Sequence, residues 1–210
     1  MEALGGYPTK SSKLKAKKLR VLLSMTVGVG CLFLLQTQLV KPRKPNDFYS
    51  FEAKDAKGRT VSLEKYRGKA SLVVNVASHC EHTEANYRSL QELHRELGTS
   101  HFNVLAFPCG QFGDTETGFS RDIETFAKST YGVTFPFFSK IKIMGTEADA
   151  AFKFLTDSVQ KTPKWNFWKF LVNPEGKVVR FWRTDESIES VRQEATALVR
   201  EIILKKRVEL

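Results

Sequence analysis

Cysteine is scarce in this chain, with only Cys31, Cys80 and Cys109 among 210 residues. Three cysteines cannot form the paired framework of a disulfide-rich secreted domain. Cys31 lies in an apolar run, which leaves Cys80 and Cys109 as the thiols available for chemistry in water. Internal repeats and low-complexity segments are also missing. The length fits one ordinary domain with appendages.

The remainder of the chain also lacks the strong positive charge that the total suggests. The formal net charge is +10, but residues 1–44 hold nine basic residues against the single acid Glu2. Residues 45–210 are therefore close to neutral. A nucleic-acid-binding domain needs a basic face of its own, so the sequence predicts no nucleic-acid partner.

One long apolar run stands near the N-terminus, from Val21 to Val40, and it carries no charge. Twenty residues are enough for a helix to cross a bilayer core of about 30 Å. Six basic residues precede the run and three follow it, which predicts a cytosolic N-terminus and a lumenal or extracellular domain. A cleaved signal peptide is the alternative, although the run is long and a small-residue cleavage site is lacking.

These features divide the chain into a basic tail at 1–20, a signal anchor at 21–40, a linker at 41–46 and a domain at 47–206. The last four residues, 207–210, read Arg-Val-Glu-Leu and match two positions of the lumenal retention signal Lys-Asp-Glu-Leu. Together with the predicted orientation, this favours a single-pass protein of the endoplasmic reticulum membrane with a lumenal domain.

The domain begins with alternating strand and helix signals. Residues Phe48–Ala53 and Thr60–Leu63 are predicted strands around a turn. Two buried strands follow, Ser71–Val76 and Phe102–Phe107, and an amphipathic helix, Glu84–Leu97, separates them. This order predicts a βαβ unit.

The second half reads as helices followed by a hairpin. Ser120 is the predicted N-cap of one helix, and Ala148–Leu155 is predicted to form another. Strands Trp168–Val172 and Lys177–Trp182 flank a turn, and apolar residues from 188 to 202 mark a final helix. A βαβ unit joined to a ββα unit predicts an α/β fold, a three-layer sandwich.

Cys80 occupies a chemically favourable place in this layout. It follows the strand Ser71–Val76 by four residues and precedes a helix. Unpaired N–H groups and the helix dipole favour an anion at a helix N-terminus. The sequence therefore predicts that Cys80 has a lowered pKa and acts as a nucleophile.

Three segments resemble the glutathione peroxidase family. They are Asn75-Val-Ala-Ser-His-Cys80-Glu-His-Thr83, Phe107-Pro-Cys-Gly-Gln111-Phe-Gly113 and Trp165-Asn166-Phe-Trp-Lys-Phe-Leu-Val-Asn-Pro-Glu-Gly176. The resemblance covers nearly all of 46–204, and the anchor makes the chain most similar to a membrane-anchored, cysteine-type member of the endoplasmic reticulum.

The resemblance implies a thioredoxin-like fold with Cys80 as the reacting group and Gln111, Trp165 and Asn166 as its supporting donors. It implies reduction of hydrogen peroxide through a sulfenic acid at Cys80, with organic hydroperoxides as an additional candidate substrate class. It also implies a thiol co-substrate and no prosthetic cofactor. Gly110 departs from the family pattern, where asparagine is usual.

Two features that other family members have are missing. The helix around 126–129 has no resolving cysteine, so glutathione or protein disulfide isomerases are the expected reductants, or Cys109 captures the sulfenic acid. The short segment Thr156–Trp165 lacks the insertion of tetrameric members, which implies a monomer.

Other functions fit the sequence less well than a peroxidase does. His79, Cys80 and His82 with His94 or His101 suggest a metal only weakly, and no metal is predicted. A thioredoxin-like reductase is disfavoured because Thr83 stands where a second cysteine would be. A membrane-tethered thioredoxin-fold binding or regulatory module with weak or vestigial peroxidase chemistry stays open.

Overall fold

A four-stranded sheet forms the centre of the domain in the computed structural model, which describes residues 47–208. The strand order is β4 (Phe102–Pro108), β3 (Ala70–Val76), β5 (Lys169–Val172) and β6 (Val178–Trp182). β3 runs parallel to β4 and antiparallel to β5, and β6 is antiparallel to β5. β3 and β4 end level with each other, and β5 begins beside them.

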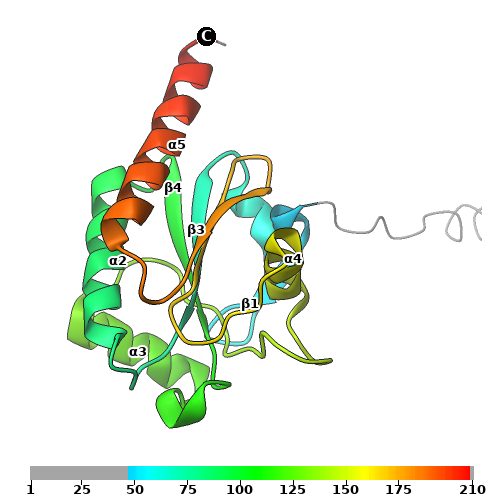
Figure 1. Ribbon diagram of the computed structural model, residues 1–210, viewed down its shortest axis with the longest axis vertical. Helices are drawn as coiled ribbons and strands as arrows, with labels where there is room; N and C mark the ends of the chain where they lie inside the picture. The colour runs from blue at the N-terminus through cyan, green and yellow to red at the C-terminus, as the bar shows by residue number, and fades with distance from the viewer. Residues whose placement is uncertain (1–46, 209–210) are drawn as a thin grey trace, which may run out of the picture. The chain divides into compact units, whose positions relative to one another are not determined.

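Helices cover both faces of this sheet, as Figure 1 shows. On one face lie α2 (Thr83–Leu97), α3 (Ser120–Tyr131) and α5 (Ile188–Val208), and on the other lies α4 (Ala150–Val159). The two core clusters follow this division, because one includes Leu90 and Val199 and the other includes Phe152. The predicted three-layer α/β sandwich is confirmed.

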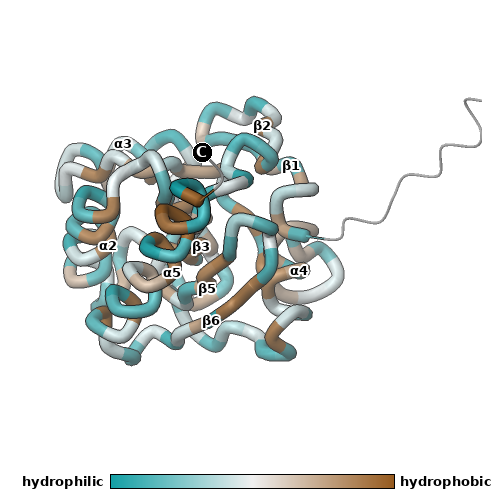
Figure 2. Tube along the Cα trace, turned by 90° about the horizontal axis from the view of Figure 1, so that it is seen from above, coloured by the Kyte–Doolittle hydropathy of each residue, from teal (hydrophilic) through white to brown (hydrophobic). Residues whose placement is uncertain are grey.

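β3 and β4 are buried along their whole length, as expected for strands with a helical layer on each side. Figure 2 shows hydrophobic residues along the strands between helices whose outer faces are mostly hydrophilic. The aromatic residues Phe135, Phe137 and Phe138 also belong to the core, and each is less than 5% exposed.

The predicted N-terminal hairpin is present but shorter than expected. It consists of β1 (Glu52–Lys54) and β2 (Thr60–Ser62), followed by a 3-10 turn, η2 (Leu63–Tyr66). Phe48–Ser50, predicted as strand, is instead the 3-10 turn η1, because the Asp47 carboxylate accepts hydrogen bonds from the backbone of residues 49 and 50.

The predicted N-cap of α3 was wrong by one residue. Phe119 holds the cap position without a side-chain hydrogen bond, and Ser120 is the first helical residue. The Ser120 hydroxyl accepts instead from the backbone N–H of Lys140, so it joins α3 to a distant loop. α4 begins later than predicted, because Asp149 caps it through the N–H groups of residues 151 and 152.

α5 extends past the predicted end of the domain, so Arg207 and Val208 of the retention-like tail are helical. No helix within residues 47–208 is both long and apolar enough to cross a membrane. The predicted anchor at 21–40, its flanking segments 1–20 and 41–46, and the final residues 209 and 210 lie outside the described residues.

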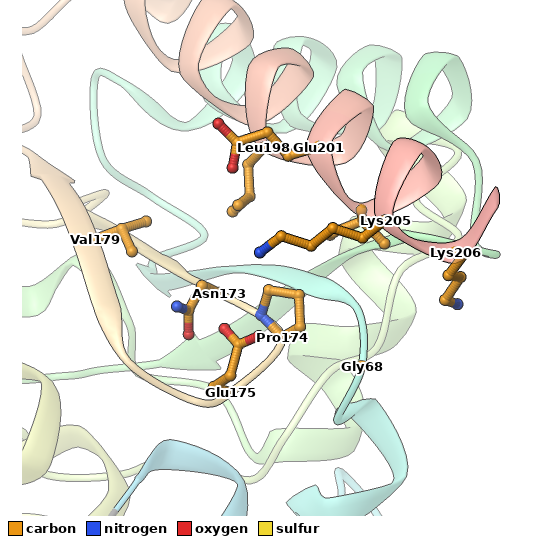
Figure 3. A pocket seen from close by; sticks show the side chains of 10 residues that line it. Gly68, Asn173, Pro174, Glu175, Val179, Leu198, Glu201, Lys205 and Lys206 are labelled. Atoms are coloured by element: carbon orange, nitrogen blue, oxygen red, sulfur yellow. The ribbon is translucent and has the colours of Figure 1, made fainter. Parts of the chain in front are cut away.

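A cavity of about 270 Å³ lies between the β5–β6 turn and the C-terminal half of α5. Figure 3 shows the Lys205 side chain reaching toward the turn at Pro174 from α5. None of the predicted site residues lines this cavity. It therefore belongs to a different part of the domain from Cys80.

Candidate active site

Thr83 shapes the loop that carries Cys80 from the end of β3 into α2. Its hydroxyl donates to the carbonyl of Ala77 at 3.0 Å and accepts from the backbone N–H of Cys80 at 3.0 Å. Its own N–H donates to the Cys80 carbonyl at 2.9 Å. Thr83 thus holds both ends of the turn and fixes Cys80 at the first turn of α2.

The Cys80 thiol is 7% exposed and donates to Oε2 of Glu81 at 3.4 Å. Burial raises the pKa of the Cys80 thiol, and the Glu81 carboxylate raises it further. The backbone N–H of His82 and the side-chain amide of Asn166 lower the pKa without cancelling the rise. The predicted lowering of the pKa was therefore wrong for the protein without a bound substrate.

The physical reason is the balance of two effects. A helix N-terminus stabilises a thiolate only by a modest amount at the protein surface. Cys80 is nearly covered, so forming an anion there costs hydration energy, and a carboxylate one residue away repels it. Strand-and-helix pattern alone does not report burial or the orientation of Glu81.

Asn75 joins the second part of the site to β3. Its side-chain amide donates to the carbonyl of Trp165 at 3.1 Å, and its Oδ1 accepts from the N–H of Trp168 at 3.0 Å. Its backbone carbonyl accepts from Phe167 at 2.7 Å. The sequence predicted no role for Asn75. Its signal was a polar side chain inside a fully buried strand, which needs hydrogen-bond partners.

Asn166 is fully buried, and its side-chain amide lies close enough to Cys80 to help lower the pKa of the thiol. Its Nδ2 donates to the hydroxyl of Thr115 at 2.9 Å, while its Oδ1 is buried without a partner among the described residues. The following residue, Phe167, has a positive φ of 62°. Such a backbone is unfavourable outside glycine and is seen where surrounding contacts enforce it.

Trp165 is half-buried and contacts the ring of Phe112 at 6.1 Å between centroids. Its Nε1 is buried without a hydrogen-bond partner among residues 47–208. The indole still lies close enough to the Glu81 carboxylate to help lower the pKa of that group. A buried indole N–H without a partner is a donor available to a substrate.

Lys169 supports this segment from below. It is 1% exposed, and its ammonium donates to the carbonyl of Phe167 at 2.8 Å. Burial lowers the pKa of Lys169 to about 8, although Glu186 and Asp185 oppose the shift. The buried ammonium of Lys169 thus holds the backbone of Phe167, the residue with the positive φ next to Asn166.

Gln111 does not contact Cys80 in this structure. Its Oε1 accepts from the N–H groups of Ile143 and Met144 at 2.6 and 3.0 Å. Its Nε2 donates to the Met144 carbonyl at 3.1 Å. The family resemblance places Gln111 beside the reacting sulfur, whereas here both ends of its amide hold a loop.

A segment at 113–118 ties the two halves of the site together. The carbonyl of Thr115 accepts from the N–H of His79 at 2.9 Å, and the Thr115 hydroxyl accepts from Asn166. Next to it, Oε2 of Glu116 accepts from the Ser78 hydroxyl at 2.9 Å. Burial raises the pKa of the Glu116 carboxyl, while Ser78 and His79 lower it.

Gly110, the residue that departs from the family pattern, lets this segment approach β4. A Cβ added at Gly110 would lie 2.9 Å from the backbone oxygen of Glu116. Such a contact is too short for a side chain, so only glycine fits without a shift of the backbone.

Cys109 directly follows β4, and its N–H donates to the Val76 carbonyl at 3.1 Å. The two strand ends therefore lie side by side. The side chains diverge, because Cys80 packs with the α2 layer and Cys109 packs with the α4 layer. Both are free thiols, and burial also raises the pKa of Cys109.

The histidines do not gather around Cys80. His94 is buried against Phe135, and burial lowers its pKa, whereas His79 packs beside Phe126 at the surface. Within residues 47–208 no group of three or more His, Cys, Asp or Glu side chains is placed to hold a metal ion.

Comparison with known proteins identifies the family. The glutathione peroxidase family model matches residues 48–156, which is just over half of the chain. The chain belongs to the glutathione peroxidase family. A Tetraodon nigroviridis protein named "Probable glutathione peroxidase 8" is 85% identical over the full length of both chains, and the human protein of that name is 59% identical over the same span.

Human glutathione peroxidase 7 is 53% identical over 87% of this chain and 97% of its own. Among solved structures, the crystal structure of T. cruzi GPX1 has a TM-score of 0.62 at 27% identity and covers 73% of this chain and 97% of that one. These likenesses confirm the thioredoxin-like α/β fold. Members of this family use a thiol co-substrate without a prosthetic cofactor.

Proposed function

We propose that this protein is a cysteine-type peroxidase that reduces hydrogen peroxide with Cys80 and is recycled by external thiols. The observation that carries the proposal is a buried thiol at the α2 N-terminus with the Asn166 amide beside it. The Glu81 carboxylate contacts this thiol and also lies near the Trp165 indole. Organic hydroperoxides are a further substrate class of the same chemistry.

In the first step the sulfur of Cys80 attacks one peroxide oxygen. An S–O bond forms as the O–O bond breaks, and the thiol proton ends on the departing oxygen, which yields a sulfenic acid and water or an alcohol. The unpartnered N–H of Trp165 and the Asn166 amide are donors for the charge that develops on the oxygens.

In the second step a thiol condenses with the sulfenic acid, which gives a disulfide and water, and a further thiol then releases Cys80. Glutathione and protein disulfide isomerases are the proposed reductants. Cys109 as an internal partner stays a prediction, because its side chain packs in the opposite layer. Mass spectrometry after one equivalent of peroxide tests it, and the role requires a peptide that links Cys80 to Cys109.

The proposed setting is the endoplasmic reticulum membrane, with residues 21–40 as a single-pass anchor, a cytosolic N-terminus and a lumenal monomeric domain that answers oxidative stress. The support is the charge-flanked apolar run and the retention-like C-terminus. Protease protection of tagged full-length protein in microsomes tests this topology, and cleavage of a C-terminal tag from outside would contradict it.

The first measurement is stopped-flow tryptophan fluorescence of the reduced protein mixed with hydrogen peroxide, beside the variant Cys80→Ser. Trp165 lies next to the reacting group, so oxidation should change its emission. A peroxide-dependent change that the variant lacks supports the peroxidase. An unreacted Cys80 would favour the second candidate, a membrane-tethered binding or regulatory module.

A further inference from the structure

The surroundings of the Cys80 thiol hinder the loss of its proton. The sulfur must lose its proton before or during attack, yet it is 7% exposed and lies beside a negative charge. The amide of Gln111 is occupied at Ile143 and Met144 and does not stabilise an anion at Cys80. A route for the proton is therefore needed at neutral pH.

The structure offers one proton acceptor in contact with the thiol. Oε2 of Glu81 lies 3.4 Å from the Cys80 sulfur and accepts its hydrogen bond. The other carboxylate oxygen, Oε1, lies 3.4 Å from Nε2 of His82. The Glu81 side chain is 64% exposed, so its outer end is free to rotate between the sulfur and an incoming peroxide.

We propose that Glu81 is a catalytic residue that takes the proton from the Cys80 sulfur and delivers it to the departing peroxide oxygen. This inference rests on the proposed peroxidase function. The S–H proton passes to Oε2, the sulfur electron pair forms the S–O bond, and the O–O bond breaks. The oxygen that leaves as hydroxide takes the proton from Glu81, so the products are sulfenic acid, water and the original carboxylate.

The surrounding groups keep Glu81 in the ionised form that can accept a proton, although they also weaken it as a base. Its own backbone N–H, the Cys80 thiol, His82 and Trp165 all lower the pKa of Glu81, so the carboxylate is ionised at neutral pH. The groups that face the pair from the segment before β5 are Trp165 and Asn166, and neither titrates.

A repulsion-only role for Glu81 predicts the opposite kinetics. A carboxylate that merely raises the pKa of Cys80 slows the reaction, so its removal would speed peroxide reduction. A proton carrier predicts that its removal gives more thiolate and a slower reaction together. Both roles predict more thiolate when Glu81 is removed, but one predicts a faster reaction and the other a slower one, so the rate separates them.

The experiment uses the full-length chain in detergent with Cys31→Ser and Cys109→Ser in every sample, so that Cys80 is the single thiol. Glu81→Gln keeps the size of the side chain and removes its basicity. Glu84→Gln is the matched control, because Glu84 lies in the first turn of α2 and pairs with Arg88 at 2.9 Å without contacting the sulfur. Thiolate is titrated by ultraviolet absorbance, and the peroxide reaction is followed by stopped flow.

We expect Glu81→Gln to titrate at a lower pH than its parent and yet to react about 100-fold more slowly at neutral pH. Its rate should follow the thiolate fraction, whereas the parent keeps a plateau at neutral pH. Glu81→Asp should recover part of the rate, and Glu84→Gln should match the parent. Circular dichroism checks the fold of each variant.

A Glu81→Gln rate equal to or above that of the parent would overturn the proton-carrier role and leave the peroxidase intact. The same conclusion follows if Glu84→Gln slows the reaction as much as Glu81→Gln does, because charge alone would then explain the loss. If the parent itself leaves peroxide unreduced, the proposed function fails first, and that result is distinct from either outcome.

Discussion

Cys80 and Cys109 occupy neighbouring places in the fold and have different surroundings. Each follows one of two parallel strands that end level with each other, and burial raises the pKa of both thiols. Cys80 contacts the Glu81 carboxylate and lies beside the buried Asn166 amide, whereas Cys109 lies in the α4 layer with its sulfur 3.8 Å from Oε1 of Gln111. The loops at the sheet edge, rather than the strand ends, therefore determine the surroundings of each thiol.

Replacing each thiol in turn gives the largest expected difference between the two sites. Cys80→Ser should lower the rate of the first step with peroxide by about 10³-fold or more, because the nucleophile is lost. Cys109→Ser should leave that first step within a few fold, since the sulfur of Cys109 lies in the other layer. Stopped-flow fluorescence measures both rates. Equal losses in the two variants would contradict the proposed difference between the two thiols.

Replacing the amides beside the two thiols should separate chemistry from architecture. Asn166→Leu should slow the first step by about 100-fold, because an amide donor near the sulfur is removed. Gln111→Leu should instead destabilise the protein by about 2 kcal/mol, because the N–H groups of residues 143 and 144 lose their acceptor.

Urea unfolding and stopped-flow kinetics on the same preparations give both numbers for each amide variant. A loss of rate in Gln111→Leu as large as that in Asn166→Leu, at unchanged stability, would show that Gln111 turns toward Cys80 during the reaction.

A substitution at Gly110 tests how firmly the segment at 113–118 is held. Gly110→Ala should cost about 1–3 kcal/mol of unfolding free energy, because the new Cβ meets the Glu116 carbonyl at 2.9 Å. Thr117→Ala, an exposed change in the same segment, should stay within about 0.5 kcal/mol. Chemical denaturation measures both, and equal values would mean that the segment yields freely.

Lys169, which holds the segment that carries Asn166, should make the stability of the protein depend on pH. The pKa of Lys169 is about 8 in the folded protein, compared with 10.5 for an ordinary lysine, so the unfolded chain binds more protons between these limits. Stability should therefore rise with pH in this window, by about 1.5 kcal/mol between pH 8 and 9.5. Lys169→Met should remove this rise in a series of urea unfolding curves, and an unchanged slope would contradict the assignment.

The sequence predicted the order of elements well, because long apolar strands and amphipathic helices follow their periodicity. Predicted element boundaries were wrong where a side-chain hydrogen bond outweighed the hydrophobic pattern. Asp47, for example, caps a 3-10 helix at the start of the domain, where a strand was expected. The motifs named Cys80 and Asn166, which lie close together in the structure, and their catalytic roles stay predictions. The raised pKa of Cys80, the bonds of Gln111 and the role of Asn75 depend on burial and side-chain direction, which spacing does not encode.

The segment at 113–118 holds the loop before Cys80 with one set of hydrogen bonds and Asn166 with another. Exposure of the sulfur and loss of its amide donor are therefore linked in a single local opening. A substitution that loosens Thr115 would therefore disturb the loop before Cys80 and the position of Asn166 together.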